Sequence, residues 1–169
     1  MNALSRGTRT LLVGGLLATS MVCAVQGTAT AATDSLFRSD GYGPIYVGMS
    51  QESALATGKL TNGVNTEDCG SYRWVYGAAD WVTISKTYGV YQVPAPKGTH
   101  TKEGVRVGTS AADLQGLYPA GSFGTRNNHA FFSTVTPQNA RNRFDFGIAD
   151  GKVTSLSVRS VEAYDCAAG

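Results

Sequence analysis

The chain has 169 residues, with 14 Lys or Arg against 12 Asp or Glu. A leader is predicted over residues 1–32, and its removal takes away Arg6 and Arg9, which leaves 12 basic and 12 acidic residues. This balance excludes a strongly basic protein that binds nucleic acid or anionic lipid through its overall charge.

The leader has the parts of a secretory signal peptide. A basic start precedes an apolar run over residues 11–25, and small residues follow up to Ala32, after which we expect cleavage. The run is too short for a membrane-spanning helix, which needs about 20 residues. Cleavage before a lipid-modified Cys23 is the alternative, although Val22 stands where a small residue is preferred. We therefore predict a secreted protein with no membrane attachment after cleavage.

Two cysteines remain in the exported chain, Cys69 and Cys166. An even number of cysteines in an exported protein favours a disulfide. The bond would close a loop of 98 residues, and loop entropy alone would then stabilise the fold by at most about 4–5 kcal/mol. Two free, buried thiols are the alternative.

The first half of the exported chain, residues 33–96, reads as a strand, a short helix and a set of strands. We expect a strand at 45–47, a helix between Ser50 and Gly58, a strand at 71–76 and a hairpin over 82–93. Ser50 suits a helix N-cap, because its hydroxyl can accept from an unpaired amide at the start of the helix. Gly58 suits the position just after the end of the helix.

The second half, residues 97–169, repeats this order. We expect a strand at 105–107, a helix between Ser110 and Pro119, a strand at 130–135 and a hairpin over 144–158. Leu114 and Leu117 would form the buried side of the helix. Asp150-Gly151 between two alternating apolar runs is a strong hairpin signal.

The two halves share a motif at a constant offset. Gly48-Met49-Ser50 matches Gly108-Thr109-Ser110, 60 residues later, and Val90 and Val153 hold equivalent places in the hairpins. Residues 94–98, rich in proline, read as the connection between the halves. The sequence therefore predicts an α+β fold of two tandem modules packed as one compact unit, each a short helix packed on antiparallel strands.

The segment Ile45-Tyr46-Val47-Gly48-Met49-Ser50 resembles a family signature. It is similar to the Val-x-x-Gly-Met-Thr opening shared by β-lactamase inhibitory protein and the small outer-membrane-assembly lipoproteins. The resemblance implies a helical element against a short antiparallel sheet. In the inhibitory protein two such units in tandem form a concave face that binds a protein.

The resemblance to the inhibitory protein has limits. The copies here are shorter, the two cysteines do not form a disulfide within each unit, and none of the inhibitor's contact residues can be matched. Residues 48–58 and 101–105 resemble more closely a group of uncharacterised secreted proteins of high-GC Gram-positive bacteria, which implies no activity.

Residues that could support catalysis are few. Neither His100 nor His129 has a cysteine or histidine at metal-ligand spacing, so we expect no metal and no cofactor. Ser122 lies in a Gly-Ser-Phe-Gly stretch that lacks the Gly-x-Ser-x-Gly spacing of a nucleophile turn, although a pair with His129 is conceivable. The disulfide would bring Asp68 near Asp165, and a carboxylate pair of this kind is the alternative basis for an enzyme.

Aromatic side chains gather in the first half. Strand alternation places Tyr72, Trp74 and Tyr76 on one face. Tyr and Trp are common at protein-binding and sugar-binding surfaces, so these three are the candidate binding face. The alternative is that they pack in the core.

These observations favour a secreted, non-enzymatic protein that binds a macromolecule outside the cell, for example as an inhibitor-like protein binder. An extracellular protein or a cell-wall polymer is the expected partner. The alternative is a small cell-wall-associated hydrolase or wall-binding module.

Overall fold

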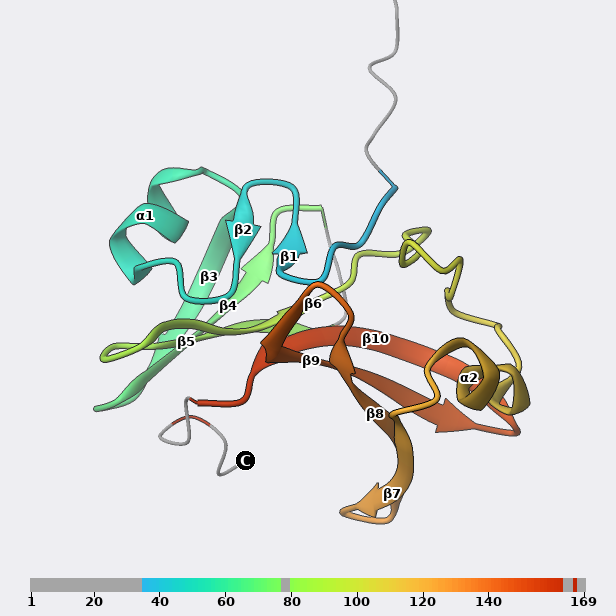
Figure 1. Ribbon diagram of the computed structural model, residues 1–169. Coiled ribbons are helices and arrows are strands. Elements are labelled where there is room, and N and C mark those ends of the chain that lie inside the picture. The colour runs from blue at the N-terminus through green and yellow to red at the C-terminus, as the bar shows by residue number, and fades with distance from the viewer. Residues whose placement is uncertain (1–34, 77–79, 163–165, 167–169) are drawn as a thin grey trace, which may run out of the picture. The chain divides into compact units, whose positions relative to one another are not determined.

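One antiparallel sheet of eight strands organises the chain in this computed structural model (Figure 1). The structure describes residues 35–76, 80–162 and 166. The predicted signal peptide, residues 1–32, therefore lies outside the described residues. All the described residues belong to one unit, residues 33–169.

The strands follow the order β3-β4-β5-β6-β10-β9-β8-β7 across the sheet. Their bounds are β3 Leu60–Asn65, β4 Cys69–Trp74, β5 Trp81–Ser85, β6 Gly89–Pro94, β7 Ser122–Arg126, β8 His129–Thr136, β9 Asn139–Ala149 and β10 Lys152–Ser160. Each half of the chain thus contributes four consecutive strands, each paired with the next.

The last strands of the two halves, β6 and β10, pair with each other in the middle of the sheet. Val93 lies opposite Val158, and Pro94 lies opposite Ser157. Without this pairing, each half would present an open strand edge. The pairing therefore joins the two halves into one sheet.

Two short helices and a small hairpin complete the fold. They are α1 Gln51–Ala56, α2 Ala111–Leu117, β1 Gly41–Tyr42 and β2 Ile45–Tyr46. Ser50 and Ser110 are the N-caps, as predicted, and their hydroxyls accept from the amides of Ser53 and Ala112 at 3.2 and 3.3 Å. Among the described residues, neither helix is long and apolar enough to cross a membrane.

The repeated motif makes the same two backbone hydrogen bonds in each half. The Gly48 N–H donates to the Val90 carbonyl at 2.8 Å, and the Val90 N–H donates to the carbonyl of the residue after that glycine. Gly108 and Val153 form the corresponding pair, also at 2.8 Å. Both glycines have a positive φ, 88° and 92°. Each motif therefore attaches the segment before a helix to the last hairpin of its half.

One face of the sheet is buried. The helices and the β1–β2 hairpin lie on this side (Figure 1), and their apolar residues form one core with those of the strands. In β9, Phe144 and Phe146 point into this core. Leu114 of α2 is buried as predicted, but Leu117 is 41 % exposed, and Tyr118 packs on Phe146 in its place.

The predicted fold class is wrong. We expected an α+β protein of two modules, each a helix on antiparallel strands, but about half of the structure is strand and a tenth is helix, in one large sheet. The physical reason is the β6–β10 pairing, which satisfies the backbone groups of both strands and leaves no boundary between two sheets.

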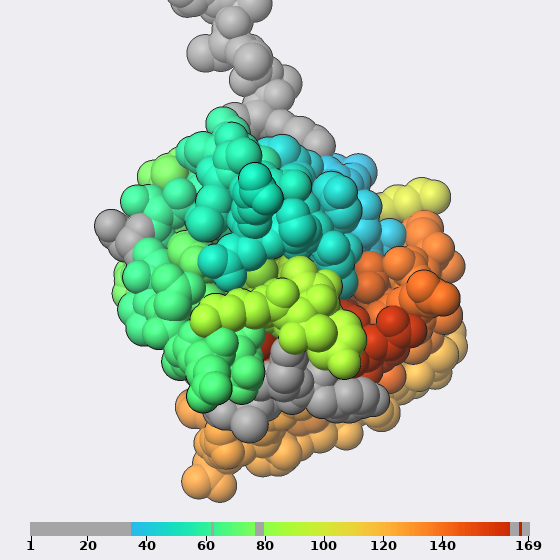
Figure 2. Space-filling model, turned by 90° about the vertical axis from the view of Figure 1, so that its left-hand side faces the viewer, coloured from blue at the N-terminus to red at the C-terminus, as the bar shows by residue number. Residues whose placement is uncertain are grey.

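The β5–β6 turn packs closely on the segment before α1. In Figure 2 this turn, in lime, lies against the cyan part of the chain that contains α1. A Cβ atom at Gly89 would lie 2.5 Å from the Met49 carbonyl oxygen, whereas a Cβ atom at Gly98 would have nothing within 4 Å. The two glycines have almost the same φ, 80° and 83°.

We predict that Gly89→Ala destabilises the protein more than Gly98→Ala. Both changes place a side chain at positive φ, which costs about 1–2 kcal/mol. Gly89→Ala adds a collision with backbone, worth about 1–3 kcal/mol more. Urea unfolding monitored by tryptophan fluorescence measures the difference. Equal losses in the two variants would contradict the close packing of this turn.

Candidate functional site on the open face of the sheet

The aromatic residues predicted as a binding face lie mostly in the core. Tyr72 is 5 % exposed, and its hydroxyl donates to Asn65 Oδ1 at 2.8 Å. Trp74 is 1 % exposed, and its indole N–H donates to the Pro94 carbonyl at 3.1 Å. The structure therefore corrects the prediction for these two residues, because β4 turns this side of the strand toward the helices and not toward solvent.

Tyr76 differs from the other two. It lies just beyond the end of β4 and is 53 % exposed. Its ring stacks on Trp74 with 5.8 Å between the ring centroids, and the Lys59 ammonium lies 5.7 Å from its ring. A role for Tyr76 in binding stays a prediction.

We predict that Trp74→Ala lowers the free energy of unfolding by about 3–5 kcal/mol, as expected for loss of a buried aromatic side chain. The matched change Tyr76→Ala should cost less than about 1 kcal/mol, because that ring is half in solvent. Guanidinium unfolding monitored by circular dichroism gives both values. A Trp74→Ala protein as stable as the wild type would place the indole outside the core.

The predicted disulfide is present. Cys69 at the start of β4 is bonded to Cys166, with 5.8 Å between the two Cα atoms. The bond joins the last described residue of the second half to the sheet of the first half.

The other face of the sheet, which we call the open face, is covered by neither of the helices that the structure describes. Its side chains can be followed through the pairing register, since directly opposed residues share a face. One row crosses six strands through Ser71, Thr83, Gln92, Arg159, Arg143 and Val135. At a strand spacing of about 4.8 Å, five intervals make the row about 24 Å wide.

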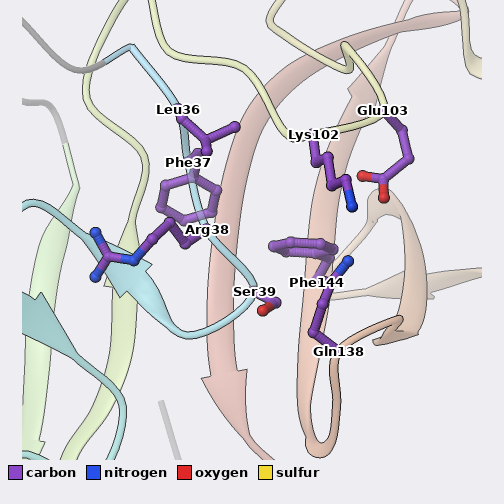
Figure 3. Close-up of a pocket in the computed structure, with 8 residues that line it drawn as sticks. All are labelled: Leu36, Phe37, Arg38, Ser39, Lys102, Glu103, Gln138 and Phe144. Atoms are coloured by element: carbon purple, nitrogen blue, oxygen red, sulfur yellow. The ribbon is translucent and has the colours of Figure 1, made fainter.

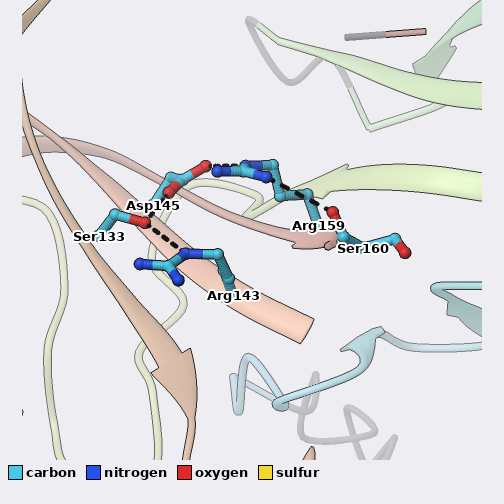
Figure 4. Close-up of polar contacts among 5 residues, drawn as sticks. All are labelled: Ser133, Arg143, Asp145, Arg159 and Ser160. Atoms are coloured by element: carbon cyan, nitrogen blue, oxygen red, sulfur yellow. Dashed lines mark hydrogen bonds and ion pairs between the residues drawn. The ribbon is translucent and has the colours of Figure 1, made fainter. Parts of the chain in front are cut away.

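A polar network occupies the middle of the open face (Figure 4). The Arg159 Nε–H donates to Asp145 Oδ2, and the Ser133 hydroxyl donates to Asp145 Oδ1. Arg143 Nε donates to the Ser133 oxygen at 3.0 Å. The Arg159 and Asp145 side chains are only 17 % and 18 % exposed. Asp145 therefore orients two arginines, one directly and one through a serine.

The ion pair keeps Arg159 charged. Burial opposes the positive charge, but attraction to Asp145 and the hydrogen bond between them outweigh it, with a smaller contribution from Tyr91. The pKa of Arg159 is therefore raised above its ordinary value. The guanidinium is a fixed cation in this face.

We predict that Asp145→Asn lowers the free energy of unfolding by about 1–3 kcal/mol, because it removes a charged hydrogen-bond acceptor from a largely buried arginine. The control is Glu162→Gln, which removes the same charge from the exposed pair with Arg141, where the atoms are 3.6 Å apart. That change should cost less than about 0.5 kcal/mol. Thermal unfolding of both variants tests this, and a Glu162→Gln loss as large as that of Asp145→Asn would contradict it.

Two further arginines lie over aromatic rings. The Arg73 guanidinium carbon is 4.3 Å from the centre of the Trp81 ring, and that of Arg126 is 5.4 Å from the Phe131 ring. Phe131 fits closely over Gly124, where a Cβ atom would lie 2.7 Å from its ring. Stacking on aromatic rings holds a guanidinium in place while its N–H groups stay available.

We call this surface the arginine face. Its members on the strands are Arg73, Arg126, Arg141, Arg143, Arg159, Asp145, Trp81 and Phe131. Among the strand residues that the structure describes on this side, Asp145 is the single acidic one. This face therefore has a local excess of positive charge, although residues 33–169 together carry 12 basic and 12 acidic residues.

The residues considered for catalysis are not brought together. Ser122 and His129 lie on paired strands, but His129 is opposite Arg126, four residues from Ser122, so about 13 Å of strand separates them. Asp68 is exposed, and its proposed partner Asp165 lies outside the described residues. In the part of the chain that the structure describes, no three His, Cys, Asp or Glu side chains are placed to hold a metal ion.

The arginine face was not predicted from the sequence, although the alternation of charged and aromatic residues in β9 indicates it. The polar sequences of residues 126–129 and 138–143 are typical of loops, whereas the structure has them largely in the β7–β8 hairpin and in β9. Arg143 and Asp145 alternate with Phe144 and Phe146, which is the period of a strand with one buried face.

Comparisons of this chain with protein-family models, with curated proteins and with solved structures find no match. The resemblance to β-lactamase inhibitory protein and to the secreted proteins of high-GC Gram-positive bacteria therefore stays a prediction.

Proposed function

We propose that this is a secreted, non-enzymatic protein that binds an acidic protein outside the cell through the arginine face. The observation that carries the proposal is the arrangement of this face, in which Asp145 and two aromatic rings hold arginines on the side of the sheet that neither described helix covers. The disulfide and the predicted signal peptide support export.

The composition of the face suits a protein partner. Arginine and aromatic residues are enriched in the centre of protein interfaces, while Lys and Glu are depleted. Arg73 and Arg126 stack on rings, so little conformational entropy is lost when they bind a carboxylate. Acidic side chains on the partner would complete the unused hydrogen-bonding positions of these arginines.

The size of the face is comparable with that of a protein interface. It is about 24 Å wide across six strands, and these strands have 5 to 11 residues, so they extend from about 17 to about 36 Å along it. A typical stable interface buries about 800 Å² on each partner. One partner could therefore bind across the junction of the two halves.

Affinity capture from the producer's culture fluid and wall extract, on the immobilised oxidised protein, tests the proposal. We expect one acidic protein to be retained in stoichiometric amount, and its affinity to fall with added salt. The double variant Arg73→Gln/Arg126→Gln should weaken binding on the order of tenfold. Its control is Lys97→Gln/Arg106→Gln, which removes the same charge from exposed positions between β6 and α2 and should bind as the wild type does.

Three outcomes would contradict the proposal. Equal retention by both double variants would remove the arginine face as the site. Retention of wall polymer alone would favour the wall-binding alternative. Wall turnover by the purified protein that is lost with Asp68→Asn would favour the hydrolase.

A further inference from the structure

The pocket beside the N-terminal segment is lined by residues of the core (Figure 3). Phe37 and Phe144 line it, but these rings are only 0 % and 2 % exposed, with 6.0 Å between their centroids. Arg38 lines it as well, and its guanidinium binds Asp40 at 2.9 Å and the Gly43 carbonyl at 3.0 Å. The pocket therefore offers little surface to a ligand, whereas an edge of the sheet offers more.

The sheet ends at β7 on one side and at β3 on the other, and no further strand that the structure describes pairs with either (Figure 1). The register of β3 with β4 shifts between Thr61 and Val64, and a bulge of this kind turns an edge away from further pairing. β7 pairs with β8 without a shift over all five of its residues. Four of these five are exposed, and the strand contains no proline or lysine. β7 is therefore the edge that another strand can join.

Two residues of β7 direct their backbone groups away from the sheet. The turn between β7 and β8, residues 127–128, has φ values of 49° and 64°, which is typical of a two-residue hairpin turn. The residues that flank such a turn, here Arg126 and His129, form a hydrogen-bonded pair, and bonded and non-bonded pairs then alternate along the strands. The N–H and C=O groups of Phe123 and Thr125 therefore point away from β8, and each residue leaves one donor and one acceptor for another strand.

The side chains beside this edge differ between the two faces of the sheet. On the covered face, Phe123 is 52 % exposed and packs edge-on against Phe132, with 4.9 Å between the ring centroids. On the open face, the Arg126 guanidinium lies over the Phe131 ring. An added strand would therefore meet an apolar side chain on one face and a cation on the other.

The charge around this edge is positive. The sequence has no acidic residue between Asp113 and Asp145, and this stretch contains Arg126, Arg141 and Arg143. β7, β8 and their turn all lie within it. An extended segment with carboxylates would be attracted to the edge, whereas a second copy of this chain would bring the same positive edge and be repelled. The charge therefore favours an acidic segment of another protein as the occupant.

We propose that an extended acidic segment of the partner protein adds to the sheet as a ninth strand, antiparallel to β7. Strand addition is a general mode of peptide recognition, in which backbone hydrogen bonds give affinity and alternate side chains give specificity. Directly opposed residues share a face, so the residues opposite Phe123 and Thr125 would be apolar and the residue opposite Arg126 acidic. The orientation continues the antiparallel pairing of the sheet. The inference rests on the proposed function, since it takes its acidic partner from there.

Titration of the ¹⁵N-labelled oxidised protein with the blocked peptide Glu-Val-Glu-Val-Glu, followed by NMR, tests the proposal. In the antiparallel register its valines stand opposite Phe123 and Thr125, so we expect the amide signals of these two residues to shift, with a Kd of about 1 mM or tighter. N-methylation of both valines removes the donors that face β7 and should weaken binding about tenfold or more. N-methylation of the glutamates should change binding much less, because their amides face solvent. The peptide with lysine in place of glutamate should bind about tenfold more weakly.

Two substitutions at one position of the edge give a matched test. Thr125→Pro removes an N–H that points away from β8, and proline is tolerated at an edge position of this kind. Thr125→Val keeps both backbone groups. We expect Thr125→Pro to weaken the peptide about tenfold or more and Thr125→Val to bind it as the wild type does. Thermal unfolding shows whether each variant is folded.

Failure of this inference is distinguishable from failure of the proposed function. If Thr125→Pro retains the acidic protein from culture fluid as well as the wild type does, while Arg73→Gln/Arg126→Gln does not, the arginine face binds without strand addition. That result overturns the inference and leaves the proposed function standing. Equal weakening by the two N-methylated peptides, or no shift of the Phe123 and Thr125 amides at about 10 mM peptide, well above the expected Kd, also overturns it. So does dimerisation of the wild type that Thr125→Pro abolishes, because a second copy would then be the occupant.

Discussion

The pairing of β6 with β10 is the constraint on which the rest of this structure depends. It is the contact that turns two four-stranded halves into a single sheet. The buried core is continuous across it, with Val93 of one half beside Val158 of the other. The row of side chains on the open face is continuous as well, since Gln92 stands opposite Arg159. Neither the core nor the arginine face would exist as one surface if the halves were separate.

The sheet is covered on one side, and the two sides have different chemistry as a result. On the covered side, β9 contributes phenylalanines to the core. On the open side, the same strand carries Arg143 and Asp145, which form hydrogen bonds with Ser133 and, in the case of Asp145, with Arg159. Arginine suits such a position because its stem packs on the sheet while its planar head binds carboxylates or stacks on rings.

Local features of the fold could be predicted from the sequence. Ser50 and Ser110 cap helices, and Asp150 and Gly151 form a turn in which both residues have positive φ, 51° and 69°. These depend on a few neighbouring residues. The cysteine pair could also be predicted, because the number of cysteines left no other partner.

The features of the fold that could not be predicted from the sequence depend on contacts between residues that are distant in the chain. The edge strands β3 and β7 are rich in polar residues and glycine, and they are strands because a neighbour pairs with them. The pairing of β6 with β10 has no sequence signal of its own. Alternation showed that Tyr72 and Trp74 share a face, but not which face the helices cover.

The disulfide has a mechanical consequence. Pulling on the C-terminal end of a protein normally peels away its last strand, here β10, one hydrogen bond at a time. In this chain Cys166 is bonded to Cys69, so the force passes through a covalent bond into β4. The C-terminal segment is thus attached to the sheet in two places, at the end of β10 through the chain and at the start of β4 through the disulfide. In the sheet, β5 and β6 lie between these two strands. In the oxidised protein, tension from this end would load β4 before β10, and reduction would change which strand resists first.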